Sequence, residues 1–280
     1  MNRVVTLART PLVTVERFDH APGVAHRDPE RERADGYAIN FIEGGGFRVR
    51  TTGAWHEAGD DRVFVTRPGL EFSCAHDDEF PCDACLSVRF SDEAVESLRG
   101  TGAPDGRAVL APLTNRRAYV RRALAGDGAA DPARMEALAG ALWWSMARPA
   151  PPRLPLFSPA RLHWFAARVD RARQRIDTDF AEPLTLDAIA RDSGLSVYHF
   201  ARVFAELVGL PPHRYLQHAR LDAARARLRA GAAVTDTCFA VGFGSLSHFA
   251  TTYRARFGER PSTTLRGRDT HRGTQGARLG

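Results

Sequence analysis

The densest cluster of chemically reactive side chains lies in the N-terminal half of the chain. Three cysteines and one histidine fall within twelve positions, namely Cys74, His76, Cys82 and Cys85. Cys82 and Cys85 form a CxxC pair, and thiolate and imidazole groups are the usual ligands of tetrahedral zinc. The same spacing also suits a redox-active thiol pair, or thiols that are simply buried. The cluster is therefore a candidate zinc site with two competing interpretations.

No set of residues typical of an enzyme accompanies this cluster. The sequence has no GxSxG nucleophile elbow, no GxxxxGK phosphate loop and no HExxH motif. His56 and His76 alone do not supply the converging imidazole and carboxylate ligands of a metal-dependent enzyme. We therefore expect a binding protein rather than an enzyme.

A second group of functional side chains lies near the C-terminus and suits nucleic acid. Short polar and aromatic groups stand there beside arginines, and such side chains hydrogen-bond to base edges and phosphates. Arg202 is the strongest candidate, because one guanidinium group can donate two hydrogen bonds to one guanine. The candidate DNA-contacting residues are Ser196, Val197, Tyr198, Ala201, Arg202, Ser245, Leu246, Ser247, His248, Thr251 and Arg254.

These candidates belong to two copies of one helical unit. A shift of 49 positions superimposes four pairs of residues, Phe200 on Phe249, Phe204 on Tyr253, Gly209 on Gly258 and Pro212 on Pro261. Further upstream the shift is 48 and places Gly194 on Gly242. The second copy therefore has one extra residue in the turn after Gly242.

Each copy reads as two helices joined by a turn. In the first copy, Thr185 is the expected N-cap of a helix over LDAIARD, and Gly194 suits the left-handed turn that ends it. A second helix should begin at Ser196 and end at Gly209, with four apolar side chains inward, Phe200, Val203, Phe204 and Leu207. The second copy repeats this plan with a cap at Ser245, and Cys238 is expected in its core.

This arrangement resembles the DNA-binding domain of the AraC/XylS family of transcription regulators, in which two helix-turn-helix units share a linking helix. The residues that carry the resemblance are Leu186 to Ala190, Gly194, Ser196 to Phe204, Gly209, Pro212, Arg220, Leu221, Ala224, Gly242, Phe243, Phe257, Gly258 and Pro261. Thr264 to Arg266 depart from the pattern, since the family often has an aromatic residue followed by Arg.

The resemblance implies a cytoplasmic transcription regulator, often an activator, whose two recognition helices enter successive major grooves of double-stranded DNA. It implies RNA polymerase as a partner and an N-terminal cupin-like β-barrel sensor domain that responds to a small-molecule or metal effector or forms a homodimer. The expected fold class is thus α+β, with an all-α double helix-turn-helix domain at the C-terminus.

The N-terminal half has a sequence pattern that fits such a sensor domain. Short runs with partial alternation at 37–42, 46–51, 62–66 and 86–90 predict strands of a small barrel or sandwich, and the charged residues 1–36 are expected to form an arm. Residues 91–148 read as helical. One helix there carries an apolar stripe, which is either intradomain core or a dimerisation face and consists of Met135, Leu138, Leu142, Trp143 and Met146.

Proline and charge mark the border between two domains. We expect a sensor domain over 1–148, a proline-rich linker over 149–160, a DNA-binding domain over 161–270 and a tail over 271–280. From residue 151 onward there are 20 Arg and 11 acidic residues, a net charge of +9, whereas residues 1–150 carry 19 Arg and 22 acidic residues, a net charge of −3. A basic C-terminal half fits a DNA-facing domain. No apolar run is long enough to cross a bilayer.

One alternative function belongs to a different class. Some DNA-alkylation response proteins fuse a zinc domain to an AraC-like one, and a zinc-held cysteine accepts a methyl group. Such a domain needs four cysteines, and this chain offers three before the linker. We therefore favour the transcription regulator.

Overall fold

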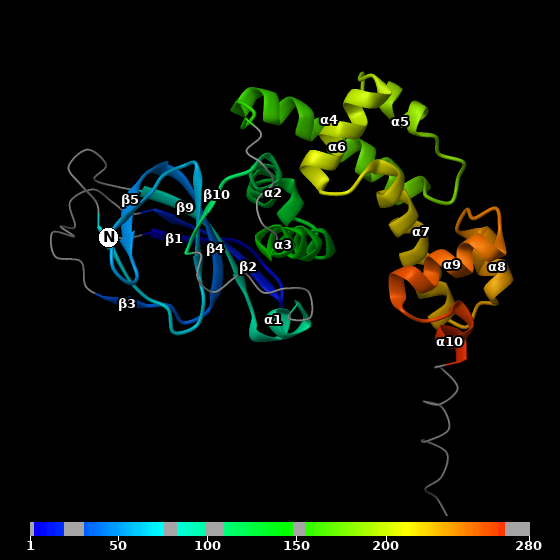
Figure 1. Ribbon diagram of the computed structural model, residues 1–280, viewed down its shortest axis with the longest axis horizontal. Helices are drawn as coiled ribbons and strands as arrows, with labels where there is room; N and C mark the ends of the chain where they lie inside the picture. Colours follow the sequence, from blue (N-terminus) through cyan, green and yellow to red (C-terminus); the bar gives the residue numbers. More distant parts are fainter. Residues whose placement is uncertain (1–2, 20–30, 76–82, 99–108, 148–154, 267–280) are drawn as a thin grey trace, which may run out of the picture. The chain divides into compact units, whose positions relative to one another are not determined.

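A computed structural model of the chain describes residues 3–19, 31–75, 83–98, 109–147 and 155–266. The chain divides into two compact units, Met1–Leu162 and His163–Gly280 (Figure 1). This border lies close to the end of the predicted linker, and the helix α4, Pro159–Asp179, crosses it. The described part of the first unit holds all the strands, and that of the second is helical.

The strands of the first unit form two antiparallel sheets. One sheet has six strands in the order β1-β2-β9-β4-β7-β10, and the other has four in the order β3-β8-β5-β6. The strands are β1 (Arg3–Arg9), β2 (Val13–Asp19), β3 (Glu32–Arg33), β4 (Tyr37–Gly45), β5 (Phe47–Arg50), β6 (His56–Ala58), β7 (Arg62–Thr66), β8 (Glu71–Ala75), β9 (Asp83–Phe90) and β10 (Leu110–Pro112). Each of the four predicted strands is present, so the β-rich character of this unit is confirmed.

The six-stranded sheet is covered on both faces. Ile42 of β4 and Cys85 of β9 are paired neighbours in an apolar cluster with Phe47 of the smaller sheet. On the opposite face, Tyr37 and Phe90 contact the ring of Trp143 in the helix α3, Pro132–Ala147. A strand buried on both faces has little need of polar alternation, and this explains the nearly continuous apolar run YAINFI.

Helices complete the first unit. They are α1 (Asp92–Leu98), α2 (Asn115–Ala125), the short 3₁₀ helix η2 (Asp127–Ala129) and α3. In α3, Met135, Leu138, Leu142 and Trp143 are buried inside the unit, and Met146 is half-buried. The apolar stripe is therefore intradomain core, and a dimerisation face along it is excluded for these buried residues.

A buried arginine fastens α2 to its neighbours. The guanidinium group of Arg117 donates to the carbonyl oxygens of Pro112 and Ser145, and to Ser145 Oγ. Burial, together with the neighbouring Arg116, lowers the pKa of Arg117 to about 10. The side chain is fully buried yet well supplied with acceptors, so it serves as a structural tie between β10, α2 and α3.

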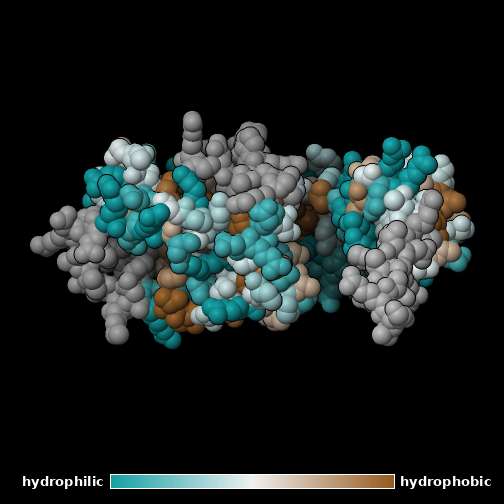
Figure 2. Space-filling view, turned by 90° about the horizontal axis from the view of Figure 1, so that it is seen from below, coloured by the Kyte–Doolittle hydropathy of each residue, from teal (hydrophilic) through white to brown (hydrophobic). Residues whose placement is uncertain are grey.

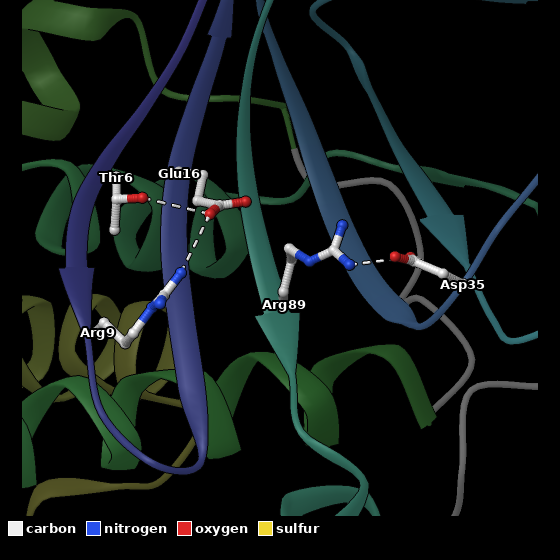
Figure 3. A network of polar contacts seen from close by, with 5 residues as sticks. All are labelled: Thr6, Arg9, Glu16, Asp35 and Arg89. Atoms are coloured by element: carbon white, nitrogen blue, oxygen red, sulfur yellow. Dashed lines mark hydrogen bonds and ion pairs between the residues drawn. The ribbon is translucent and has the colours of Figure 1, made fainter.

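The predicted arm over residues 1–36 was wrong for the part that is described. Residues 3–9 and 13–19 form β1 and β2, and β2 pairs along its whole length with β9. Val13 and Val15 are buried, while charged side chains project from the other face. Figure 3 shows part of this polar surface, where Glu16 accepts from Thr6 and pairs with Arg9, and Arg89 pairs with Asp35. Part of the charge of the segment thus lies on the paired strands β1 and β2.

The second unit follows the predicted plan. Its helices are α4, α5 (Leu186–Asp192), α6 (Val197–Val208), α7 (Pro212–Arg229), α8 (Val234–Ala240), α9 (Leu246–Phe257) and α10 (Pro261–Arg266). In Figure 1, α7 runs between the α5–α6 pair and the α8–α9 pair. The fold class, an α+β chain with a C-terminal double helix-turn-helix, is confirmed.

One face of the described residues is mostly hydrophilic (Figure 2). In the face drawn in Figure 2, brown apolar patches are small and separated by teal surface. None of the described helices combines the length and apolar character that a membrane crossing requires.

Candidate nucleic-acid interface

Matching caps place the two predicted recognition helices. Ser196 Oγ accepts from the backbone N–H of His199, and Ser245 Oγ accepts from that of His248, both at 3.4 Å. Gly209 ends α6 at φ +84° and Gly258 ends α9 at φ +75°. Only glycine adopts this left-handed conformation without strain. The two helices therefore begin and end at equivalent residues, as the duplicated sequence predicts.

The inward faces of these helices are the predicted ones. In α6, Phe200, Val203, Phe204 and Leu207 are buried, and in α9, Phe249 and Tyr253 are buried and Phe257 is half-buried. Cys238 is buried in the same core as Phe249, and burial raises the pKa of its thiol. The second helix-turn-helix copy thus has an apolar core of its own.

The predicted DNA-contacting side chains lie on the outward faces. Ten of the eleven are exposed, and Ala201 is half-buried. Tyr198 has 79% of its surface accessible, an unusual exposure for a tyrosine, and Val197 and Leu246 are also exposed apolar residues. Ser196 and Ser245 are accessible as well, although their oxygens already serve as caps. Each helix therefore presents a mixed apolar and polar stripe to its surroundings.

Arginine on each stripe is available for a ligand. Among the described residues, Arg202 and Arg254 are exposed, and neither guanidinium group makes a hydrogen bond or ion pair. Two other exposed arginines of this unit are engaged: Arg191 pairs with Asp187, and Arg256 donates to both carboxylate oxygens of Asp222 at 2.7 to 2.8 Å. An unpaired guanidinium group on a recognition helix suits a base or a phosphate.

The two histidines beside the caps differ in environment. The ring of His199 packs against Phe165 with 5.5 Å between ring centroids, and its Nε2 is buried. The exposed His248 lies 5.7 Å from the ring of Phe243. His199 is therefore a packing residue, while His248 stays accessible.

The pairing of Arg256 was not foreseen from the sequence, although helical periodicity contains the signal. Arg256 follows the core residue Phe249 by seven positions, so the two side chains share a face of α9. Arg254 follows Phe249 by five positions and points elsewhere. The helical position relative to Phe249 therefore distinguishes Arg256, which is paired, from Arg254, which is exposed and available.

The last helix docks without the aromatic residue that the AraC/XylS family often has at this position. Thr264 is buried, and its Oγ1 lies 2.9 Å from the hydroxyl oxygen of Tyr253 and donates to Glu259 at 2.9 Å. Arg225 of α7 lies 3.8 Å from the same carboxylate. A polar network thus holds α10 against α9 and α7.

The predicted zinc ligands are only half described. Cys74 on β8 is half-buried and packs against the apolar cluster that contains the buried Cys85 of β9. His76 and Cys82 lie outside the described residues. Among those that are described, no three His, Cys, Asp or Glu side chains form a metal-binding group. The zinc site stays a prediction.

One comparison with known proteins matches the helical unit. The model of the family "Helix-turn-helix domain" matches residues 189–267. The chain is 35% identical over 105 residues to the HTH-type transcriptional activator RhaS of Escherichia coli, and the match covers 37% of this chain and 38% of RhaS.

The chain is also similar to solved structures. A probable AraC family transcriptional regulator from Rhodopseudomonas palustris is 30% identical, with 36% of this chain and 97% of that chain covered and a TM-score of 0.35. An AraC-type transcriptional regulator from Chromobacterium violaceum is 29% identical, with 41% and 96% covered and a TM-score of 0.35.

Proposed function

We propose that the chain is a sequence-specific, DNA-binding transcription regulator of the AraC/XylS family, because its C-terminal unit matches the helix-turn-helix family model. One observation carries the proposal: two equally capped helices turn their core residues inward and each leaves an unpaired arginine on its exposed stripe. Such a stripe fits the major groove, whose base edges offer acceptors for arginine and a methyl group on thymine.

The linking helix supports a two-groove mode of binding. The 18 residues of α7 correspond to a length of about 27 Å, at 1.5 Å per residue. Successive major grooves on one face of the duplex recur about every 34 Å. Recognition helices attached at opposite ends of α7 can therefore reach neighbouring grooves, so we infer that one chain covers roughly two turns of DNA.

The two helices should differ in how they read sequence. The stripe of α6 offers Arg202 and Tyr198 for hydrogen bonds, whereas that of α9 combines the apolar Leu246 with the short Thr251. Short and apolar side chains favour contacts with thymine methyl groups and recognition of DNA shape. We therefore propose stricter base recognition by α6 than by α9.

The decisive experiment is selection of a binding site from random DNA with the full chain, followed by titration of the selected site. Arg202→Ala should weaken binding to that site about tenfold to a hundredfold and relax preference at one base pair, because a bidentate contact contributes roughly 1–3 kcal/mol.

Arg191→Ala is the matched control. It removes the same charge from an arginine that Asp187 already neutralises, so the preference for the selected site should persist. If Arg202→Ala leaves both affinity and preference unchanged, α6 is not the recognition helix that we propose.

The first unit is proposed as the control domain. A small-molecule or metal effector, or a second copy of the chain, would shift the population of states in which the second unit is presented to DNA. RNA polymerase is the expected partner at the promoter, the cytoplasm is the expected location, and no catalytic role is proposed for either unit.

Zinc remains a proposal for the first unit, favoured by the packing of Cys74 against the cluster that contains Cys85. We expect about one equivalent of zinc in tag-free protein purified under reducing conditions, and its loss in Cys82→Ser, because a tetrahedral site needs its thiolate ligands. Cys238→Ser is the control, since that thiol is buried in the other unit. Metal-free wild-type protein would leave the cysteines to core or redox roles.

A further inference from the structure

The two helix-turn-helix units are connected twice, once by the chain and once through space. Along the chain, only α7 leads from one unit to the other. Through space, the second connection is the segment Phe180 to Glu182, which directly follows α4. This segment reaches the second helix-turn-helix unit, where the Phe180 side chain packs against the core formed around Phe249 and Tyr253. A segment that belongs by sequence to the first helix-turn-helix unit thus packs against the second helix-turn-helix unit.

Arg220, in the middle of α7, holds this segment by its backbone. Its Nε donates to the carbonyl oxygen of Phe180 at 2.7 Å, and its Nη2 donates to that of Glu182 at 2.9 Å. A guanidinium fork supplies two donors in one plane, which a lysine ammonium group cannot reproduce. Arg220 is therefore matched to a pair of carbonyls two residues apart.

The carbonyl between these two meets the turn that leads to α9. Gly242 lies in that turn at φ +86°, and a Cβ atom there would stand 2.7 Å from the carbonyl oxygen of Ala181 and 3.0 Å from Cζ of Arg220. Both the backbone conformation and the close approach require glycine. The carbonyls of residues 180, 181 and 182 are all held, two by Arg220 and one by contact with this turn.

A second tie lies one helical turn earlier on α7. The hydroxyl of Tyr215 donates to Asp177 of α4 at 3.1 Å and accepts from Arg173 at 3.3 Å. With this tie, α4 and the segment that follows it are fixed along α7, from the first helix-turn-helix unit to the turn before α9. A lone helix bends, whereas a helix braced on one side resists bending and twisting.

We propose that the contact of Arg220 with residues 180–182 and Gly242, here called the Arg220 clamp, sets the angle between the two recognition helices and thereby the half-site spacing that the protein accepts. The clamp makes Arg220 a positioning residue, and this role rests on the proposed DNA-binding function. The angle matters because a change of two base pairs rotates one half-site by roughly 70° around the duplex axis, at 10–10.5 base pairs per turn.

The first test varies the spacing between the two half-sites of the selected DNA site, one base pair at a time, with the full chain as binder. Wild-type protein should show one sharp optimum. In Arg220→Lys, which keeps the charge, the preference for the optimum over a spacing two base pairs away should fall roughly tenfold, the scale of losing one to two hydrogen bonds. Affinity for a single half-site should stay unchanged.

Arg227→Lys is the matched control, because Arg227 is exposed on the same helix and lies outside the clamp. It should retain the sharp optimum. Gly242→Ala is a second clamp variant and should flatten the spacing profile as Arg220→Lys does. A sharp optimum retained in a folded Arg220→Lys protein overturns the proposal.

The second test needs no DNA, so it separates failure of the clamp from failure of the proposed function. Spin labels attached through genetically encoded azide residues at positions 198 and 247 report the distance between α6 and α9. A narrow distance distribution in wild type that broadens in Arg220→Lys, and stays narrow in Arg227→Lys, supports the clamp. An unchanged distribution overturns it, even if the wild-type chain selects no DNA sequence at all.

Discussion

At the scale of single residues, the partner of a side chain decides its role. The second unit contains many arginines of identical chemistry, yet Arg191 and Arg256 are paired with carboxylates, Arg220 binds carbonyls, and Arg202 and Arg254 are free among the described residues. A paired guanidinium group would have to break its bonds before contacting DNA. The two arginines on the recognition stripes are therefore among the available ones.

Thr237 of α8 should limit the stability of the second unit. The side chain is 0% exposed, and its Oγ1 has no hydrogen-bond partner. Thr237→Val replaces the hydroxyl with a methyl group of similar shape, so we expect the free energy of unfolding to rise by about 1 kcal/mol. Chemical denaturation of the full chain measures this change.

Thr264→Val provides the opposite case for comparison. The Thr264 hydroxyl is also buried but bonds to Tyr253 and Glu259, so its loss should lower the unfolding free energy by about 1 kcal/mol. Equal effects of the two substitutions would show that the partner of the hydroxyl does not matter here.

At the scale of elements, short-range signals position the helices. Thr185, Ser196 and Ser245 each accept a backbone N–H of the first turn that follows, and glycines with positive φ end α6 and α9. These signals act within a few residues and are independent of the rest of the fold. The boundaries of the recognition helices therefore do not depend on distant contacts.

The packing of α7 on α9 should make stability depend on pH. The pKa of His218 on α7 is lowered by burial and by the nearby Arg256 and Arg214, and Asp222 offsets this only in part. The folded protein thus binds the proton less tightly than the unfolded chain. The contribution to stability is complete above the ordinary histidine pKa of about 6.5 and is lost as pH falls below it.

Thermal unfolding between pH 7.5 and 5.5 measures this dependence. We expect the melting temperature of wild type to fall more steeply than that of His218→Gln. His213→Gln, which changes an exposed histidine of the same helix, should behave like wild type. Parallel curves for wild type and His218→Gln would assign the pH dependence to other groups.

At the scale of the whole molecule, charge is divided between the two halves, −3 over residues 1–150 and +9 from residue 151 onward. Binding of the basic half to DNA releases counterions, so affinity should fall as salt rises. Fluorescence anisotropy at several salt concentrations gives the slope of log affinity against log salt. Arg254→Ala should reduce that slope by about 1 if Arg254 contacts a phosphate.

Arg48→Ala in the first unit is the matched control for this measurement. Arg48 is exposed on β5, where its guanidinium group lies near the ring of Trp55. It should leave the slope unchanged, because the acidic half is not expected to face DNA. A slope that is insensitive to Arg254→Ala and sensitive to Arg48→Ala would reverse the proposed roles of the two units.

The amino-acid sequence alone determined the second unit almost completely. Its caps, its turn glycines and its apolar periodicity are local, and the duplication repeats the N-caps and the terminal glycines of the two recognition helices. It also placed Arg202 and Arg254 on exposed stripes, because a helix of known phase assigns each residue to a face. Sequence spacing could not show whether the zinc ligands come together, because ligands on separate strands converge only through the fold.

Only the tertiary structure decided the features that join distant segments. The strand β2 escaped prediction because its pairing partner β9 lies about 70 residues further along the chain, and β1 pairs in turn with β2. The stripe on α3 could be read as core or as an interface, because periodicity shows that a face is buried but not what buries it. The Arg220 clamp unites residues 180–182, 220 and 242, and no local pattern indicates that three such segments meet.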